Sequence, residues 1–276
     1  MVADSHLAPE AHAFNCNWAA AGAFVRASHA DLTVHLGDVT VDGLGDPGQF
    51  AHTQAISASW PTAIRYLPGN HDIGDNPPGP GVTAKHPLDP RRISEFRAAF
   101  GADYWTFDAA DWRVIGLNAQ LFGTEGPDEA AQWVWLCDIA VESRGVPVIL
   151  MLHKPLFQDS PSDPTPHHRV VPIAARRRLL ELLSIAPVHA VISGHTHQYW
   201  DRAVDGIRHI WVPSTAYYLP DEIQDRVGEK ITGLGMLELS RGVYRFHLVC
   251  PDGVSRHSAL DHPVYPELVA ARPAVR

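Results

Sequence analysis

The chain has few cysteines, no long apolar run and no surplus of basic residues. Its three cysteines, Cys16, Cys137 and Cys250, are widely spaced, a pattern that offers neither a disulfide framework nor a Cys-x-x-Cys zinc site. No apolar run reaches the roughly 18 residues of a membrane-spanning helix, and the N-terminus lacks the order of segments that marks a signal peptide. We therefore expect a soluble protein of the reducing cytoplasm, with no membrane partner.

Acidic residues outnumber basic ones. The sequence has 31 Asp and Glu against 22 Lys and Arg, a formal net charge of -9, whereas surfaces that bind nucleic acid carry clustered Lys and Arg. The one dense basic run, residues 176–178, falls in an expected helix and is predicted to be a solvated face. A nucleic-acid partner is therefore not expected.

Short apolar runs alternate with helical stretches along the 276 residues, of which 45% are hydrophobic. This composition suffices to bury one large core, and we expect a single domain over residues 1–276. Apolar runs predict buried strands at Leu32–Leu36, Ala63–Leu67, Val114–Leu117, Val146–Leu152, Val188–Ile192 and His209–Val212. Helices are expected near Ala19–Ala30, Pro47–Trp60, Arg91–Phe100, Asp128–Ser143 and Val171–Ile185. The alternation favours an α/β fold with ligands at the strand ends.

Two pairs of segments predict antiparallel hairpins. One joins Tyr104–Phe107 to Trp112–Leu117, and the other joins Gly233–Ser240 to Val243–Val249, forming a C-terminal hairpin at about 231–250. The sheets should therefore be mixed rather than purely parallel.

Two proline-rich stretches, Gly74–Pro90 and Phe157–His168, interrupt the alternation. Neither composition supports a regular element, because proline removes a backbone donor and fixes φ. Each stretch follows candidate site residues, and long loops in that place are more often functional than spacers. We predict lids over the site, with simple surface loops as the alternative.

Five short polar strings each follow an apolar run. They are Asp4-Ser5-His6, Gly37-Asp38, Gly69-Asn70-His71-Asp72, His153 and Gly194-His195-Thr196-His197. Taken singly, each has an ordinary explanation, because Gly-Asp and Gly-Asn are turn signals and most of the 17 histidines must be surface or core residues. Taken together, they supply the oxygen and nitrogen ligands that suit Zn, Mn, Fe or Co. Such a set can hold two metal ions side by side.

This ordered series, Asp-x-His, Gly-Asp, Gly-Asn-His-Asp, His and Gly-His-x-His, resembles the calcineurin-like metallophosphoesterase superfamily. It runs from Asp4 to His197, in the order and at the separations found there. The resemblance implies an α/β fold of four layers, an αββα sandwich in which helices flank two mixed β-sheets. It also implies a hydrolase of phosphoesters that uses two divalent or mixed-valence transition-metal ions, Mn, Fe, Zn or Co.

The resemblance implies metal ligands in two sets that share one carboxylate. One ion would be bound by Asp4, His6, Asp38 and His197, and the other by Asp38, Asn70, His153 and His195. A shared carboxylate suits ions roughly 3.5–4 Å apart, which lower the pKa of a bridging water and make hydroxide available as the nucleophile. Only three residues precede Asp4, fewer than the roughly five of a full strand, so the first strand is either unusually short or incomplete in this sequence.

By the same resemblance, His71 is not a metal ligand. It would stand near the leaving group as a general acid or charge stabiliser, with Asp72 orienting its imidazole and the Asn70 amide stabilising charge on the phosphoryl oxygens. A turn and helix cap is the structural alternative for His71 and Asp72. Purple acid phosphatases place a tyrosine where this chain has Val41, so a tyrosinate-bound ferric ion is not expected.

The metal core does not select a substrate. The spacing and modest size resemble bacterial class III cyclic-nucleotide and glycerophosphodiester phosphodiesterases, so a small-molecule phosphodiesterase is our leading expectation. A phosphomonoesterase acting on nucleotides, sugar phosphates or phosphoproteins is the alternative, and a catalytically inactive interaction scaffold is a remote one. Weak candidates for substrate contacts are Asn118, His167 and His168, each with a turn or a solvated loop as its alternative. The oligomeric state stays open, and a homodimer is one option.

Overall fold

The computed structural model describes residues 1–79, 82–266 and 268, and its larger sheet has six strands. The strands run in the order β3-β4-β5-β6-β8-β7; β4, β5, β6 and β8 are parallel, and the edge strands β3 and β7 are antiparallel to their neighbours. They are β3 (Trp105–Ala109), β4 (Trp112–Leu117), β5 (Val148–Leu152), β6 (Val188–Ser193), β7 (Trp200–Val204) and β8 (Ile207–Trp211). The sheet is therefore mixed, as the sequence predicted.

A second layer of strands is assembled around the N-terminal segment. β1 (Leu32–His35) is parallel to β2 (Ala63–Tyr66), and β9 (Leu234–Ser240) forms an antiparallel hairpin with β10 (Val243–Val249). The Val2 N–H donates to the Val34 carbonyl, and the Val2 carbonyl accepts from the Leu36 N–H, both at 2.9 Å. On the other side, the Gly235 N–H donates to the Met1 carbonyl at 3.0 Å. Residues 1–3 thus join the two strand pairs and fix the chain that leads to Asp4.

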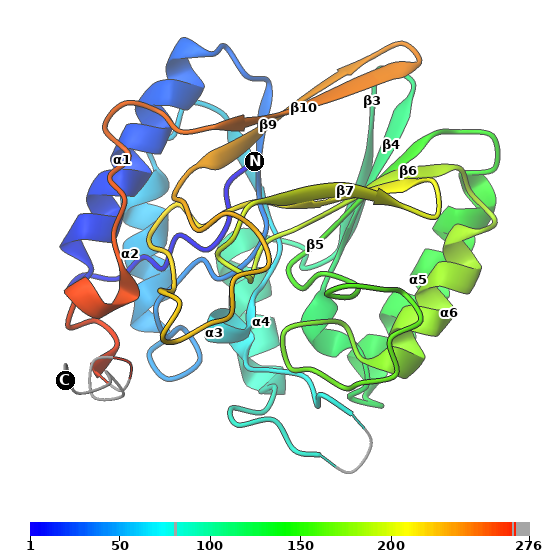
Figure 1. The fold of residues 1–276 in the computed structure, drawn as a ribbon, viewed down its shortest axis with the longest axis horizontal. Coiled ribbons are helices and arrows are strands. Elements are labelled where there is room, and N and C mark those ends of the chain that lie inside the picture. Colours follow the sequence, from blue (N-terminus) through cyan, green and yellow to red (C-terminus); the bar gives the residue numbers. More distant parts are fainter. Residues whose placement is uncertain (80–81, 267, 269–276) are drawn as a thin grey trace.

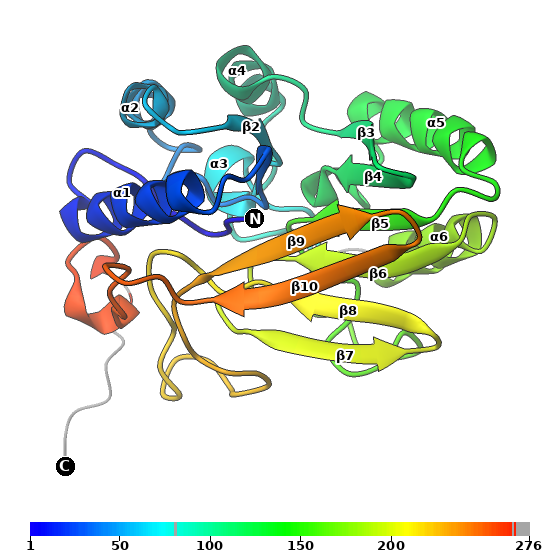
Figure 2. The same ribbon diagram turned by 90° about the horizontal axis from the view of Figure 1, so that it is seen from above.

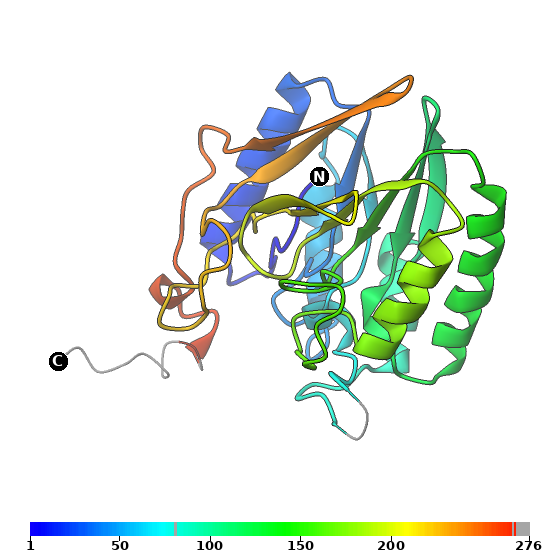
Figure 3. The same cartoon turned by 45° about the vertical axis from the view of Figure 1, so that its right-hand side comes forward.

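Helices flank the two layers of strands. In Figure 1, α1 and α2 lie to the left of the strands and α5 and α6 to the right, and Figure 3 shows α5 and α6 side by side. The helices are α1 (His12–Ala27), α2 (Gly48–Ser57), α3 (Asn70–Ile73), α4 (Pro90–Phe100), α5 (Pro127–Glu142) and α6 (Ile173–Leu183), with short 3₁₀ turns η1 (Ala119–Leu121) and η2 (Ala259–Asp261). The fold is the four-layer αββα sandwich that the resemblance implies.

The core between the sheets is built from the apolar runs themselves. Val34 and Leu36 of the second layer share one buried cluster with Val114, Ile149 and Ile192 of the six-stranded sheet. Residues of α5 and α6 cover the opposite face of that sheet. Every residue of β5 is buried, because helices cover one face and strands the other, and a strand covered on both faces reads as a continuous apolar run.

Two further predictions can be compared with the fold. The C-terminal hairpin β9-β10 falls within the span expected for it, and in the view from above it is drawn in front of β5 and β6 (Figure 2). The basic run is only partly a solvated face, because Arg177 and Arg178 are exposed whereas Arg176 is 1% exposed and its guanidinium donates to the Asp163 carbonyl. None of the helices in the described ranges is both long enough and apolar enough to cross a membrane.

Candidate metal centre

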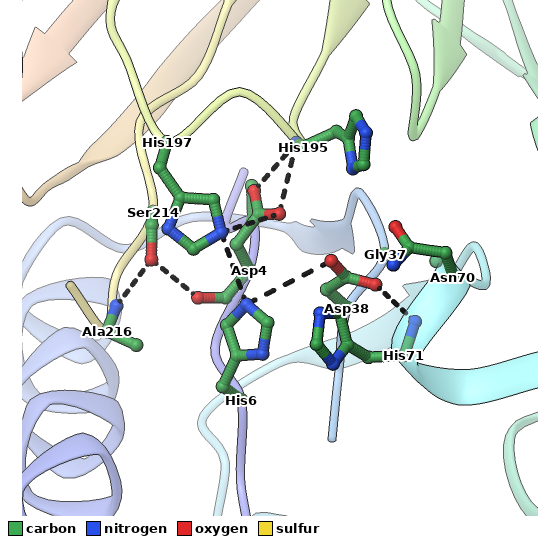
Figure 4. A network of polar contacts seen from close by, with 12 residues as sticks. Asp4, His6, Gly37, Asp38, Asn70, His71, His195, His197, Ser214 and Ala216 are labelled. Atoms are coloured by element: carbon green, nitrogen blue, oxygen red, sulfur yellow. Dashed lines mark hydrogen bonds and ion pairs between the residues drawn. The ribbon is translucent and has the colours of Figure 1, made fainter. Parts of the chain in front are cut away.

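The predicted site residues meet at one edge of the strands. Asp38, Asn70, His153 and His195 each lie just beyond the carboxyl end of a parallel strand, respectively β1, β2, β5 and β6. Such ends meet at the same edge of a sheet, where open α/β folds place their ligands. Figure 4 shows side chains from the N-terminal segment and from the loop after β6 converging on Asp38.

The side chains form two groups of potential ligand atoms. Within each group the atoms lie within 4.8 Å of one another, and the groups are Asp4, His6, Asp38 and His197, and then Asp38, His153 and His195. Asn70 adjoins the second group, with Oδ1 3.4 Å from the His153 Nε2. We call these groups the first set and the second set, the latter including Asn70. The chain therefore brings together the seven residues named from the sequence, in the same two sets.

Asp38 lies between the two sets. Its Oδ2 is 4.0 Å from the His6 Nε2 and 3.4 Å from the His153 Nε2, and its Oδ1 accepts the His71 backbone N–H at 2.9 Å. Burial alone would raise the pKa of Asp38, but the neighbouring imidazoles, His153 foremost, hold that pKa well below its ordinary value. The carboxylate is thus ionised at neutral pH, the form that can serve two cations.

Backbone carbonyls fix the tautomers of two histidines. The Nδ1 of His153 is 2.8 Å from the Leu36 carbonyl, and that of His197 is 2.9 Å from the Tyr217 carbonyl. Because a carbonyl only accepts, Nδ1 carries the proton and Nε2 faces the set. Burial lowers the pKa of His197 to about 4, so this imidazole is neutral and its Nε2 offers a lone pair. Metal-bound histidines characteristically make such an outer hydrogen bond.

His195 provides a test of whether a metal ion fits. Within the described part of the chain, its Nδ1 and Nε2 are both buried without a hydrogen-bond partner. Burial, followed by the charge of His153, holds the pKa of His195 well below its ordinary value. An unpartnered buried polar atom costs roughly 1–3 kcal/mol, and a cation shared with Asp38 would satisfy one ring nitrogen. The donors therefore fit a bound metal ion.

The backbone is unusual at the same residues. Nine non-glycine residues in the described ranges have positive φ, and five of these belong to the two sets. The values are 50° for Asp4, 45° for His6, 51° for Asp38, 68° for His195 and 53° for His197. Left-handed backbone is uncommon for such residues and is concentrated at functional sites. It re-aims each side chain out of the strand direction and toward the shared centre.

Two glycines permit the close approach of the motifs. A Cβ on Gly69 would lie 2.1 Å from the Asp38 Oδ1, and a Cβ on Gly37 would lie 2.5 Å from the His153 Nδ1. Gly37 also has φ of +99°, a conformation that side chains rarely adopt. Each of these two glycines therefore makes room for a residue of a neighbouring string.

The hydrogen bonds contradict the predicted relation between Asp72 and His71. The Asp72 carboxylate accepts from the backbone N–H groups of Val39, Thr40 and Gly69 instead. The imidazole of His71 is oriented by the Val41 carbonyl, 2.7 Å from its Nδ1. Asp72 is fully buried, and its carboxylate provides the hydrogen-bond acceptors for these backbone donors, which would otherwise lack partners. His71 is partly exposed beside the buried sets.

One of the three predicted substrate contacts is wrong. Asn118 is fully buried, its Nδ2 donates to Asp103 at 2.8 Å, and its Oδ1 accepts from the Gln120 backbone at 3.0 Å. The Oδ1 of Asn118 thus caps η1, and its Nδ2 is held by the Asp103 carboxylate. His167 and His168 belong to neither set; their rings stack at 4.6 Å in the loop before α6. These two histidines stay candidates for substrate contact.

The sequence matches one protein family over most of its length. The family, described as calcineurin-like phosphoesterase, matches residues 1–199, the part that contains both sets. The chain belongs to this family. Membership agrees with the shared Asp38 and the two sets around it, since two-metal sites of this kind clamp the oxygens of a phosphoryl group.

Two relatives of this calcineurin-like phosphoesterase have named activities. A serine/threonine-protein phosphatase, CPPED1 of Danio rerio, is 28% identical over 148 residues, covering 51% of this chain and 44% of the relative. The 3',5'-cyclic adenosine monophosphate phosphodiesterase CpdA of Pseudomonas aeruginosa is 25% identical over 198 residues, covering 67% of this chain and 61% of that protein. The chain thus spans less than two thirds of either relative.

Solved structures share the fold. A dimetal phosphatase from Danio rerio superposes with a TM-score of 0.61 at 14% identity, covering 90% of this chain and 94% of that one. At that identity the likeness establishes the fold of this calcineurin-like phosphoesterase.

Sequence reasoning missed several residues that support the sets. The Ser214 hydroxyl donates to the Asp4 carbonyl at 2.7 Å and accepts from the Ala216 N–H at 2.9 Å (Figure 4). Lys154, next to His153, is fully buried and forms an ion pair with Asp75 at 2.5 Å. Only their positions in the sequence could have marked these two residues, since Ser214 follows a strand end and Lys154 adjoins a candidate ligand.

Proposed function

We propose that this calcineurin-like phosphoesterase hydrolyses small-molecule phosphoesters with two metal ions bound by the first and second sets, within a single domain over residues 1–276. The observation that carries the proposal is the position of Asp38, whose carboxylate belongs to both sets. Imidazole nitrogens with carboxylate and amide oxygens suit Mn, Fe, Zn or Co, and no thiolate is present to select a softer ion.

Bound ions would acidify a water molecule and offset the negative charge of the phosphoryl group. Asp38 would hold the two ions together through one carboxylate. Asn70 directs Oδ1 toward His153, so its NH₂ would remain to donate to a phosphoryl oxygen.

His71 would act on the leaving group. Its Nδ1 proton is donated to the Val41 carbonyl, so Nε2 is the atom available to the substrate. When protonated, Nε2 would donate to the leaving oxygen as the bond to phosphorus breaks. The partial exposure of His71 beside the buried sets supports a role in contact with substrate rather than with metal.

The leading form of the proposal is a phosphodiesterase, supported by the likeness to CpdA. The likeness to CPPED1 favours a phosphomonoesterase as the second candidate. A diester carries one negative charge at neutral pH and a monoester close to two, so the two candidates differ in the charge that the site must balance.

Rates on bis(4-nitrophenyl) phosphate and 4-nitrophenyl phosphate, measured with added Mn²⁺, test the choice. We expect the diester to be hydrolysed faster, and Asp38→Ala protein prepared in parallel controls for contaminating phosphatases. A monoester rate at least about tenfold higher, a difference of roughly 1.4 kcal/mol in barrier, would reverse the assignment. Hydrolysis of neither ester with any of the four metals would overturn the proposed function.

A further inference from the structure

A tyrosine near the C-terminus contacts the first set. The Tyr265 hydroxyl lies 2.6 Å from the His6 Nδ1, although the two residues are 259 positions apart in the sequence. The tyrosine is 5% exposed, and its ring meets the His6 imidazole edge-on at 5.7 Å between centroids. Tyr265 lies outside residues 1–199, the part matched by the family model.

Backbone contacts hold the C-terminal segment at this place. The Tyr218 N–H donates to the His257 carbonyl at 2.9 Å, and the Ala259 N–H returns a bond to the Tyr218 carbonyl at 3.0 Å. Tyr265 then packs in a buried cluster with Phe14, Val41 and neighbouring residues. The hydroxyl is therefore delivered to His6 by a segment that is itself anchored.

The contact resembles the Nδ1 hydrogen bonds of two other histidines in the sets. The Nδ1 atoms of His153 and His197 donate to backbone carbonyls, which leaves Nε2 for the set. The Nε2 of His6 faces the set in the same way, 3.2 Å from the His197 Nε2 and 4.0 Å from the Asp38 Oδ2. For this Nε2 to offer a lone pair, the His6 Nδ1 must carry the proton, and the Tyr265 oxygen is the acceptor within reach.

We propose that Tyr265 is a positioning residue for the first metal ion. Its oxygen accepts a hydrogen bond from the His6 Nδ1–H, and this bond directs the Nε2 lone pair into the first set. The inference rests on the proposed two-metal function. Outer partners of metal-bound histidines fix the ring and its tautomer, and their loss typically costs about 10–100-fold in metal affinity. The C-terminal segment thus contributes to a centre whose ligands all lie before residue 200.

Calorimetric titration of metal-free protein with Mn²⁺ tests the role of Tyr265. In Tyr265→Phe, which keeps the ring and removes only the hydroxyl, we expect one of two binding events to weaken about 10–100-fold and the other to stay unchanged. Tyr244→Phe is the matched control, because the Tyr244 hydroxyl, on β10 of the C-terminal hairpin, donates to the His189 carbonyl of β6. This variant should bind Mn²⁺ like the wild type. His6→Ala should lose the same event, and adding Tyr265→Phe to it should change nothing more.

The outcomes separate the inference from the function it rests on. Wild-type protein that binds no Mn²⁺, Zn²⁺, Fe²⁺ or Co²⁺ would overturn the proposed function and the inference with it. Two binding events of wild-type strength in Tyr265→Phe would overturn the inference alone. So would equal weakening of both events, or a further loss on top of His6→Ala, since either result would show that the hydroxyl acts on the general fold rather than through His6.

Discussion

The carboxylate of Asp72 is joined to Thr40 by two hydrogen bonds, from the backbone N–H at 2.9 Å and from the hydroxyl at 2.7 Å. Its other oxygen accepts from the Val39 N–H at 3.1 Å and the Gly69 N–H at 2.8 Å. One buried side chain therefore fixes both turns that carry candidate ligands, Asp38 in one and Asn70 in the other. Burial, with the charge of Asp38 adding to it, raises the pKa of Asp72 to about 6.

Replacing this acceptor should destabilise the protein. In Asp72→Asn an NH₂ group faces backbone donors, so we expect the free energy of unfolding to fall by roughly 1–3 kcal/mol, the cost of leaving a buried donor without a partner. Urea unfolding of metal-free protein measures this change in unfolding free energy. Asp46→Asn is the control, because Asp46 is exposed and its carboxylate accepts a local bond from the Gly48 N–H. Coincident unfolding curves for the two variants would refute this role for Asp72.

Removing Asp38 should empty the whole centre. Because its carboxylate belongs to both sets, we expect Asp38→Ala to retain neither ion after gel filtration, whereas His153→Ala should lose only the second. Elemental analysis by mass spectrometry gives the metal content per chain. If Asp38→Ala kept one tightly bound ion, the carboxylate would not be shared.

His71→Ala should separate chemistry from metal binding. The imidazole lies in neither set and is held by the Val41 carbonyl, so metal content should match that of the wild type. We expect kcat to fall about 10²–10⁴-fold, the usual contribution of a general acid. Steady-state kinetics on bis(4-nitrophenyl) phosphate would check the rate, with metal analysis of the same sample. A variant without metal would assign His71 to the ligands instead.

The candidate site could be predicted from the sequence because its candidate ligands come in short strings at strand ends. A parallel strand delivers the next residue to a fixed edge of the sheet, so His153 after β5 and His195 after β6 had to lie close together. The resemblance supplied their division into two sets. The predicted role of Asp72 is wrong because an Asp beside a His suggests a hydrogen-bonded pair, whereas two of the donors that Asp72 satisfies are backbone N–H groups of Val39 and Thr40, 33 and 32 residues away.

Other features depend on contacts that a single sequence does not reveal. Tyr265 reaches His6 only because the C-terminal segment docks on the fold, and no local pattern marks that docking. Helix α1 begins at His12 rather than near Ala19, because tertiary contacts of the buried Asn17 outweigh its low helix propensity. Strand β7 has a local signal in the sequence, since Asp205-Gly206, between β7 and β8, is a strong hairpin turn.

Arg169 is expected to bind the substrate phosphate. The residue is half-buried, its charge acts on His195, and within the described residues its guanidinium has no ion-pair or hydrogen-bond partner. A charge-assisted hydrogen bond is worth about 1.5–3 kcal/mol, so Arg169→Ala should raise KM roughly 10–100-fold with kcat little changed. Arg177→Ala, which removes an exposed arginine of α6, is the control. Unchanged KM in Arg169→Ala would exclude the contact.

His209 should make the fold sensitive to acid. This residue of β8 is 5% exposed and packs on Phe157 at 4.6 Å between ring centroids. Burial, assisted by the charge of Arg202 and opposed by that of Asp205, lowers the pKa of His209 from 6.5 to about 4. Between pH 6.5 and pH 4, His209 is therefore protonated in the unfolded chain but stays neutral in the folded chain. The stabilisation is complete above pH 6.5 and is lost as the pH falls toward 4.

The comparison with a residue that cannot titrate isolates this effect. Between pH 7 and pH 5 we expect the wild type to lose about 2 kcal/mol more unfolding free energy than His209→Gln, measured by urea unfolding of metal-free protein at both pH values. His247→Gln is the control, because the His247 side chain is 51% exposed on β10, and it should follow the wild type. Parallel losses in wild type and His209→Gln would mean that His209 is protonated in the folded chain as readily as in the unfolded one.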